Sequence, residues 1–174
     1  ELVAGRGFWP GLCTSVKFPS RFASFTLLAK ADYPYCINLP LPFSLVSNNT
    51  YSDFIEIRPA YWWCYNTFFL LRNEWKFTNR DERVNKTQHI NIQPIAPDTV
   101  QEILQAMRLM RKWKATDEIE AFMYSAQNEK EDFPLIEISS RVVRIVRPAE
   151  AYGAYYDADL LCRDDFTPIF LSGI

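Results

Sequence analysis

The sequence predicts a mainly α-helical fold, in which a helical hairpin core lies between long, extended, aromatic-rich arms at both ends. Three observations predict it. Residues 94–134 carry apolar side chains at helical spacing between helix-capping residues, prolines interrupt residues 1–52, and 16% of the chain is aromatic. We therefore divide the chain into an extended N-terminal arm, a mainly helical core and an acidic, aromatic C-terminal arm. The ranges are 1–52, 53–148 with the hairpin at 97–128, and 149–174.

The first helix of the predicted hairpin begins at Pro97, after which Asp98 or Thr99 can cap exposed backbone N–H groups. Basic residues crowd its last turn and acidic residues open the second helix, as the helix dipoles favour. The second helix ends before Pro134. In both helices the apolar residues fall on one side: Val100, Ile103, Leu104, Met107 and Met110 in the first, and Ile119, Phe122, Met123 and Ala126 in the second.

The segment before the hairpin carries two further signals. Apolar and polar residues alternate over 53–58, with Ile55 and Ile57 on one side, which predicts a strand or an extended piece. The aromatic run 61–71 predicts a buried helix, and the polar residues 78–91 predict a loop or a short helix whose single histidine lies in solvent. The core is therefore expected to be mainly, but not wholly, helical.

The arms are predicted from breakers and aromatic residues. Residues 1–52 contain too many prolines for a compact sheet, although Phe25 to Leu28 fits a short strand. Arginine recurs at every third position of 141–147, which suits neither the helical nor the strand period, and we expect Pro148 to end that element. We see no internal repeat beyond the hairpin. Arms of this kind are typical of subunits whose neighbours bury them.

Composition excludes most catalytic classes. The chain has a net charge of −2, five glycines and one histidine, so it offers no Gly-rich phosphate loop and no obvious catalytic base. Its four cysteines are widely separated, which argues against a zinc site. We expect free thiols, and disulfide pairing stays an alternative if the compartment is oxidising. We expect no cofactor, no metal, no catalytic residue and no enzymatic activity. The longest apolar run is too short to cross a bilayer.

The hairpin resembles the right-handed helical hairpins of the cytochrome c oxidase subunit Va family, which are related in shape to tetratricopeptide and pentatricopeptide repeats. The matching features are an opening proline, an apolar pair, a leucine, an alanine and an arginine in order, a basic turn, a second helix, and then Lys-Glu, an aromatic residue and proline. They stand here at Pro97, Val100, Leu104, Ala106, Arg108, Arg111, Lys130-Glu131 and Phe133-Pro134. The resemblance covers about a quarter of the chain. It implies a non-catalytic accessory subunit on the matrix side of the mitochondrial inner membrane, in the respiratory electron-transport chain.

The leading hypothesis is therefore a scaffolding subunit of cytochrome c oxidase (complex IV). It would contact other protein subunits of a membrane-associated complex, be peripheral to the membrane, and bind neither a small-molecule substrate nor nucleic acid. The candidate interface residues are Trp9, Trp62, Trp63, Trp75, Arg108, Arg111, Trp113, Arg141, Arg144 and Arg147.

Two alternatives stay open. One is an organellar ribosomal or other RNA-binding helical protein that uses the basic residues against phosphate. The other is a secreted or viral glycoprotein with disulfides and glycans at Asn48 and Asn85. A salt-dependent affinity for RNA would support the first, and the intact mass would decide the second.

Overall fold

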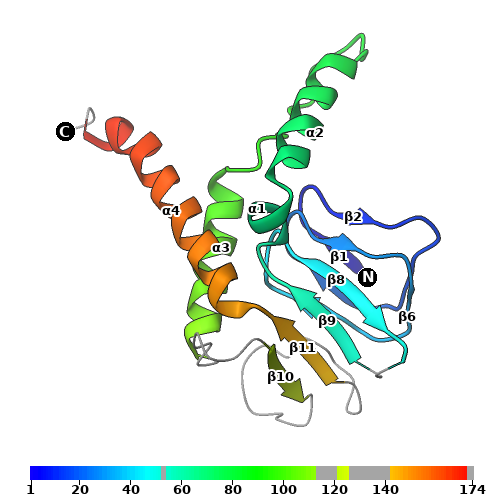
Figure 1. Cartoon of the computed structure of the whole chain (residues 1–174). Helices are drawn as coiled ribbons and strands as arrows, with labels where there is room; N and C mark the ends of the chain where they lie inside the picture. The colour runs from blue at the N-terminus through cyan, green and yellow to red at the C-terminus, as the bar shows by residue number, and fades with distance from the viewer. Residues whose placement is uncertain (52–53, 113–120, 126–141, 172–174) are drawn as a thin grey trace.

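The protein has an α/β fold in the computed structural model, which describes residues 1–51, 54–112, 121–125 and 142–171 (Figure 1). The prediction of a mainly α fold with extended arms is therefore wrong. In chain order the elements are β1 (Leu2–Ala4), β2 (Trp9–Pro10), β3 (Ser15–Val16), β4 (Ser20–Phe22), β5 (Leu27–Leu28), β6 (Asp32–Tyr33), β7 (Asn38–Leu39), β8 (Leu45–Asn49), β9 (Phe54–Arg58), α1 (Tyr61–Tyr65), α2 (Thr67–Arg80), α3 (Pro97–Lys112), β10 (Ala121–Ser125), β11 (Val142–Val146) and α4 (Pro148–Leu171).

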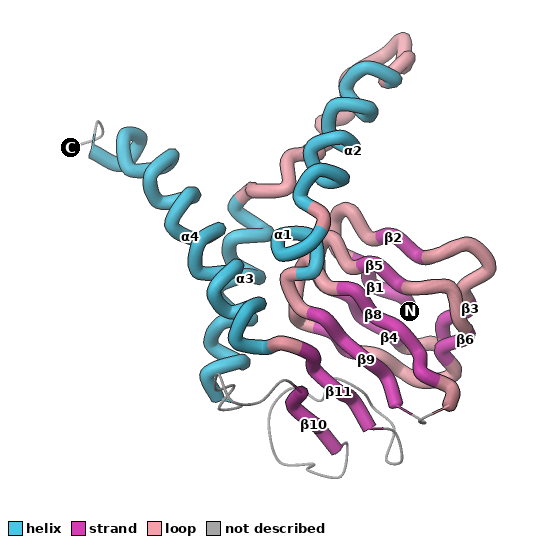
Figure 2. The backbone as a smooth tube through the Cα atoms, viewed as in Figure 1, coloured by secondary structure: helices cyan, strands magenta, loops and turns pink. Residues whose placement is uncertain are grey.

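The first 49 residues wind into stacked turns of short parallel strands, which we call the coil (Figure 2). Its strands stack in three ladders: β1-β4-β7, β2-β5-β8 and β3-β6. Trp9 pairs with Leu27, and Leu27 pairs with Leu45, so one turn of the coil takes 18 residues on this side. The coil replaces the predicted extended arm, and it is an internal repeat that the sequence analysis did not detect.

The repeat lies in backbone conformation more than in residue type. Gly7, Phe25 and Phe43 are spaced by 18 residues and share the left-handed conformation, with φ values of 71°, 56° and 58°. Glycine adopts this conformation without strain, whereas phenylalanine does so at a cost. The two phenylalanine rings stack at a centroid distance of 4.9 Å, and burial of these rings offsets the backbone strain.

Small hydroxyl side chains satisfy the backbone inside the coil. The hydroxyl of Thr26 donates to the carbonyl of Ala23, and the hydroxyl of Ser44 donates to the carbonyl of Leu41, each at 2.8 Å. Both hydroxyl residues are fully buried. A buried carbonyl without a donor would destabilise the fold by about 1–3 kcal/mol, so these bonds allow the chain to turn inward repeatedly.

One side of the coil continues into a mixed sheet with the strand order β10-β11-β9-β8-β5-β2. Strand β9 confirms the predicted alternation, because Ile55 and Ile57 are buried and their neighbours face the other side. The parallel partner β11 places Val143 beside Ile55 and Ile145 beside Ile57. The four side chains form one apolar face, which belongs to the same core as the buried residues of α3 and α4.

Helices α3 and α4 pack against each other beside the sheet, and α1 adjoins α4 (Figures 1 and 2). Tyr155 of α4 connects these layers: its hydroxyl donates to the carbonyl of Pro42 at 2.5 Å and accepts the N–H of Ala60 at 3.1 Å. Its side chain is fully buried, and burial raises the pKa of its hydroxyl far above the ordinary value. Tyr155 therefore holds α4, α1 and the end of the coil together.

Several local predictions are corrected. The first helix of the hairpin is confirmed as α3, but residues 121–125 of the predicted second helix form β10, which pairs with β11. Residues 142–146 form a strand, and Pro148 begins α4 instead of ending an element, as proline at a first helical position allows. Helix α4 replaces most of the predicted C-terminal arm. The remaining part of the predicted hairpin, including the closing Lys130 to Pro134, lies outside the described residues.

Candidate docking surface on helix α2

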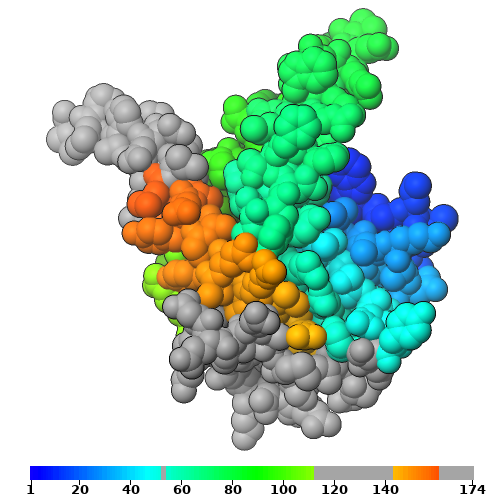
Figure 3. Space-filling model, in the orientation of Figure 1, coloured from blue at the N-terminus to red at the C-terminus, as the bar shows by residue number. Residues whose placement is uncertain are grey.

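Helix α2 projects from the body of the protein, as both the ribbon and the space-filling view show (Figures 1 and 3). Its first turn is fixed to α1, because the hydroxyl of Thr67 donates to the carbonyls of Trp62 and Trp63 at 3.3 Å and 3.0 Å. Leu70, one turn further on, is buried. The aromatic run therefore forms helices, as predicted, but α2 is held mainly at its base and is not a buried helix.

Three large apolar side chains share the solvent side of α2. Phe68, Leu71 and Trp75 are 71%, 59% and 65% exposed. At 100° per residue, positions separated by three, four and seven residues lie on one face of a helix, so these three side chains form a continuous strip. We call it the exposed face of α2. A grouped apolar strip of this kind on a projecting element is typical of an interaction surface.

A row of basic residues runs beside the exposed face. Arg72, Lys76 and Arg80 follow one another at intervals of four residues, which places them on one side of the helix. The positive charges of Arg72, burial, and the charge of Arg80 lower the pKa of Lys76 from its usual value. None of the ion pairs between described residues includes a member of this basic row. The row thus concentrates positive charge that the described part of the chain does not neutralise.

In the segment just after α2, by contrast, the basic residues have an acidic partner. Asp81 accepts two hydrogen bonds from Arg83, at 2.7 Å and 2.8 Å, and lies 3.6 Å from the ammonium group of Lys86. These bonds lower the pKa of the Asp81 carboxyl well below its usual range. The basic residues beyond the helix end therefore have an acidic partner, whereas those of the basic row have none among the described ion pairs.

The inner side of α2 borders an apolar groove of about 330 Å³. Leu70 and Phe77 of α2 line it together with Trp9 of the coil and Ile90 and Ile92 of the segment that leads to α3. The only acidic side chain of α2, Glu74, also lines this groove. The two sides of the helix therefore differ in charge: the acidic residue faces inward, and the basic row does not line the groove.

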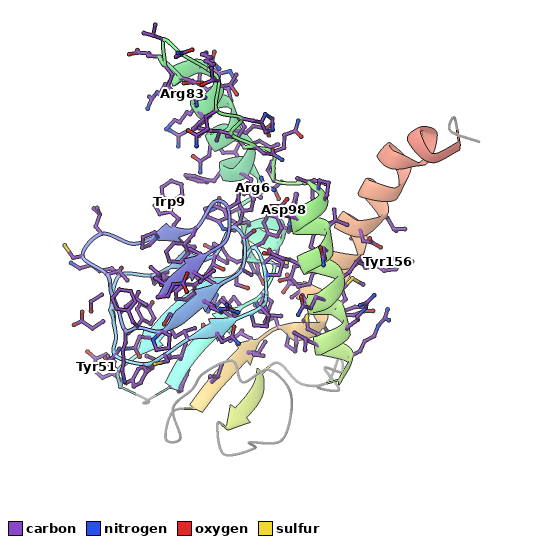
Figure 4. All side chains as sticks on the ribbon, turned by 180° about the vertical axis from the view of Figure 1, so that it is seen from behind. Arg6, Trp9, Tyr51, Arg83, Asp98 and Tyr156 are labelled. Atoms are coloured by element: carbon purple, nitrogen blue, oxygen red, sulfur yellow. The ribbon has the colours of Figure 1, made fainter. Side chains whose placement is uncertain are left out.

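Arg6, which lines the groove, forms an ion pair with Asp98 (Figure 4). Arg6 donates from Nε and Nη2 to the carboxylate of Asp98 at 3.0 Å and 2.9 Å, and its Nη1 donates to the carbonyl of Gln93. The guanidinium lies 5.2 Å from the centre of the Phe25 ring. Hydrogen bonding from Arg6 lowers the pKa of the Asp98 carboxyl. Arg6 thus fastens the coil to the start of α3 and to the segment before it.

The four candidate tryptophans with described positions do not form one interface. Trp62 is a core residue, 5% exposed, whose indole N–H donates to the carbonyl of Phe25 at 2.8 Å. Trp63 is half-buried against Phe43, and Trp9 reaches the groove with its ring centre 6.5 Å from that of Trp62. Trp75 alone belongs to the exposed face of α2.

The candidate arginines are also dispersed. Arg111 donates to the hydroxyl of Tyr152 at 2.6 Å, Arg147 donates to the hydroxyl of Tyr65 at 3.0 Å, and Arg144 lies over the ring of Phe54. These three stabilise contacts within the protein. Arg108 is exposed on α3, and the candidates Trp113 and Arg141 lie outside the described residues.

Apart from Trp75, the exposed face of α2 and the basic row beside it were not predicted, although the sequence carries a signal for them. The aromatic run 61–71 predicts a buried helix, but continuing the helical spacing to residue 80 separates the apolar strip from the basic row. The amphipathic pattern would have predicted one free face. The missed residues are Phe68, Leu71, Arg72, Lys76 and Arg80.

The described residues contain no cluster of three or more His, Cys, Asp or Glu that could hold a metal ion. Cys13, Cys36 and Cys64 are free thiols, and burial together with the nearby Glu150 carboxylate raises the pKa of Cys64 to about 11. A thiol with that pKa is not a ready nucleophile at neutral pH. Within the same described ranges, no helix is both long and apolar enough to cross a membrane.

The chain is similar to part of a longer bacterial protein. An uncharacterized protein of Treponema pallidum (strain Nichols) is 40% identical over 170 residues, which span 90% of this chain and 24% of the relative. The chain thus matches about a quarter of that longer protein. No family model and no solved structure matches. The relative belongs to a bacterium, which lacks mitochondria, so the predictions of a respiratory-chain function and of a location on the mitochondrial inner membrane are wrong.

Proposed function

We propose that this chain is a non-catalytic docking module that attaches to its partner through the exposed face of α2. The observation that carries the proposal is the grouping of Phe68, Leu71 and Trp75 in solvent on a helix that projects from the body. Burial of such side chains against a partner stabilises a complex by about 1.5–3 kcal/mol each. The rest of the fold supports the helix: the coil and the core beneath α1 hold its base.

The experiment compares three versions of the full chain in a bacterial host. The test variant carries Phe68→Ser, Leu71→Ser and Trp75→Ser. The matched control carries three serines at exposed apolar positions of the coil and its border: Leu12→Ser, Phe18→Ser and Tyr51→Ser. After gentle lysis, the share of each protein that sediments with membranes and large assemblies is measured.

We expect the wild type and the control to sediment, and the test variant to stay in the supernatant. Recovered wild-type protein must unfold cooperatively, because an aggregated chain would also sediment. Equal sedimentation of all three proteins would overturn the proposal, as would equal release of the control and the test variant.

A further inference from the structure

We propose that the surface recognised by α2 is an anionic lipid bilayer, on which the helix lies at the level of the headgroups. This inference rests on the proposed docking function and names the partner of the same surface. It concerns attachment to one leaflet only, by an amphipathic helix that lies in the interface plane.

The apolar part of the inference is the exposed face of α2. Trp75 and Phe68 have aromatic rings, and tryptophan in particular favours the boundary between headgroups and acyl chains. Leu71 lies between them on the helix surface. The strip extends over about two turns, which suits a helix that lies in the interface plane with its apolar face inserted to a depth of about 5–10 Å.

The electrostatic part is the basic row. Arg72, Lys76 and Arg80 border the exposed face, so their charged ends can reach phosphate while their stems lie along the apolar boundary. The whole chain has a net charge of −2, yet α2 carries these three basic residues against one acidic residue, Glu74, which lines the groove on the inner side. An anionic surface is complementary to the outer side of α2, where the three charges stand beside the exposed apolar strip.

The arrangement favours lipid over protein for two reasons. Lysine is depleted in protein interfaces, whereas amphipathic helices that lie on membranes carry lysine and arginine on the polar face beside Trp, Phe and Leu. The projection of α2 from the body also leaves its far end clear of the coil (Figures 1 and 3). Each basic residue near an anionic leaflet strengthens the attraction of the helix to it.

The experiment uses the purified full chain and two kinds of vesicle: phosphatidylcholine alone, and an equimolar mixture of phosphatidylcholine and phosphatidylglycerol. Binding is measured by flotation. The charge variant carries Arg72→Gln, Lys76→Gln and Arg80→Gln. Its control carries Lys17→Gln, Arg21→Gln and Lys30→Gln, which remove the same charge from exposed positions of the coil.

We expect wild type and control to bind the anionic vesicles, and the charge variant to lose on the order of 100-fold in partition coefficient. Added salt should weaken the binding, because it screens exposed charges. Brominated lipids should quench the fluorescence of Trp75, so the wild type should be quenched and the Trp75→Phe variant much less, whereas Trp9→Phe should not reduce quenching.

Absence of binding to anionic vesicles, equal losses in the charge variant and its control, or quenching that persists in Trp75→Phe would overturn the inference. This failure differs from failure of the docking function. If the serine variant of α2 is released from the sedimenting fraction while the purified wild type does not bind lipid vesicles, the docking function stands and the partner is a protein.

Discussion

The coil and α2 both contain large aromatic residues, but Tyr33 and Phe43 of the coil are buried whereas Phe68 and Trp75 of α2 are exposed. Tyr33 and Phe43 are fully buried and form part of the hydrophobic core, whereas Phe68 and Trp75 are 71% and 65% exposed. The difference comes from backbone geometry. The coil turns the rings of Phe25 and Phe43 inward at two of its left-handed corners, and α2 has only one side against the body. Aromatic abundance alone therefore says nothing about which region holds the fold and which contacts a partner.

The largest expected effect separates the two regions by stability. Phe43→Ala removes a fully buried ring that stacks on Phe25 at 4.9 Å, so it should lower the free energy of unfolding by about 3–5 kcal/mol. Phe68→Ala removes an exposed ring and should change it by less than about 0.5 kcal/mol. Urea unfolding of both variants measures the contrast. Similar losses would show that α2 contributes to the core as much as the coil does.

A second, smaller effect concerns the connection between the coil and the helices. Tyr155→Phe keeps the ring but leaves the carbonyl of Pro42 and the N–H of Ala60 without their partner. We expect a loss of about 1–3 kcal/mol in the free energy of unfolding. Tyr156→Phe, at an exposed neighbouring position of α4, serves as the control and should be neutral. A neutral Tyr155→Phe would contradict the role given to this hydroxyl.

A third effect depends on pH. Arg6 lowers the pKa of Asp98 in the folded state, so the ionised carboxylate stabilises the fold above the ordinary pKa of aspartate. That contribution is lost as the pH falls through the lowered folded pKa. Asp98→Asn should therefore cost less than about 1 kcal/mol at neutral pH, since the pair is partly exposed.

The difference between Asp98→Asn and the wild type should shrink as the solution is acidified below the ordinary aspartate pKa. Urea midpoints measured from neutral to acidic pH test this. For Glu102 the pH dependence has the opposite sign, because burial raises the pKa of its carboxyl group. Ionisation of Glu102 as the pH rises therefore weakens its contribution to the stability of the fold. A constant difference for Asp98→Asn at all pH values would exclude a titrating ion pair as the cause.

The smallest effect lies in the corners of the coil. Cys13 is exposed and has a φ of 55°, a conformation that glycine adopts more easily. Cys13→Gly should raise the free energy of unfolding, by less than about 1 kcal/mol, because relief of strain exceeds the added chain entropy. Cys36→Gly, at a buried position without such a φ, should be destabilising. A destabilising Cys13→Gly would show that the corner tolerates a side chain without strain.

Local patterns predicted the elements that local patterns determine. The alternation around Ile55 and Ile57 identified β9, and the spacing of Ile103 and Met107 identified α3. The predicted second helix failed because residues 121–125 pair with β11, and such long-range pairing overrides helical spacing.

The coil was not predicted because its repeat is one of backbone conformation and is not evident in the types of residue. Equivalent corners hold Gly7, Phe25 and Phe43, and what they share is a backbone conformation that appears only when successive turns stack. The docking surface was missed in part for a different reason. The sequence does contain the amphipathic pattern of α2, but an apolar strip that faces solvent and one that faces a core look the same until the rest of the fold is known.

The most direct test measures stability and attachment on one variant. For the chain with Phe68→Ser, Leu71→Ser and Trp75→Ser, the urea unfolding midpoint and the binding to anionic vesicles are determined beside the wild type. We expect an unchanged midpoint and loss of binding, because the coil and core hold the fold while α2 makes the contact. A large fall in the midpoint, or binding that persists at an unchanged midpoint, would contradict this division of roles.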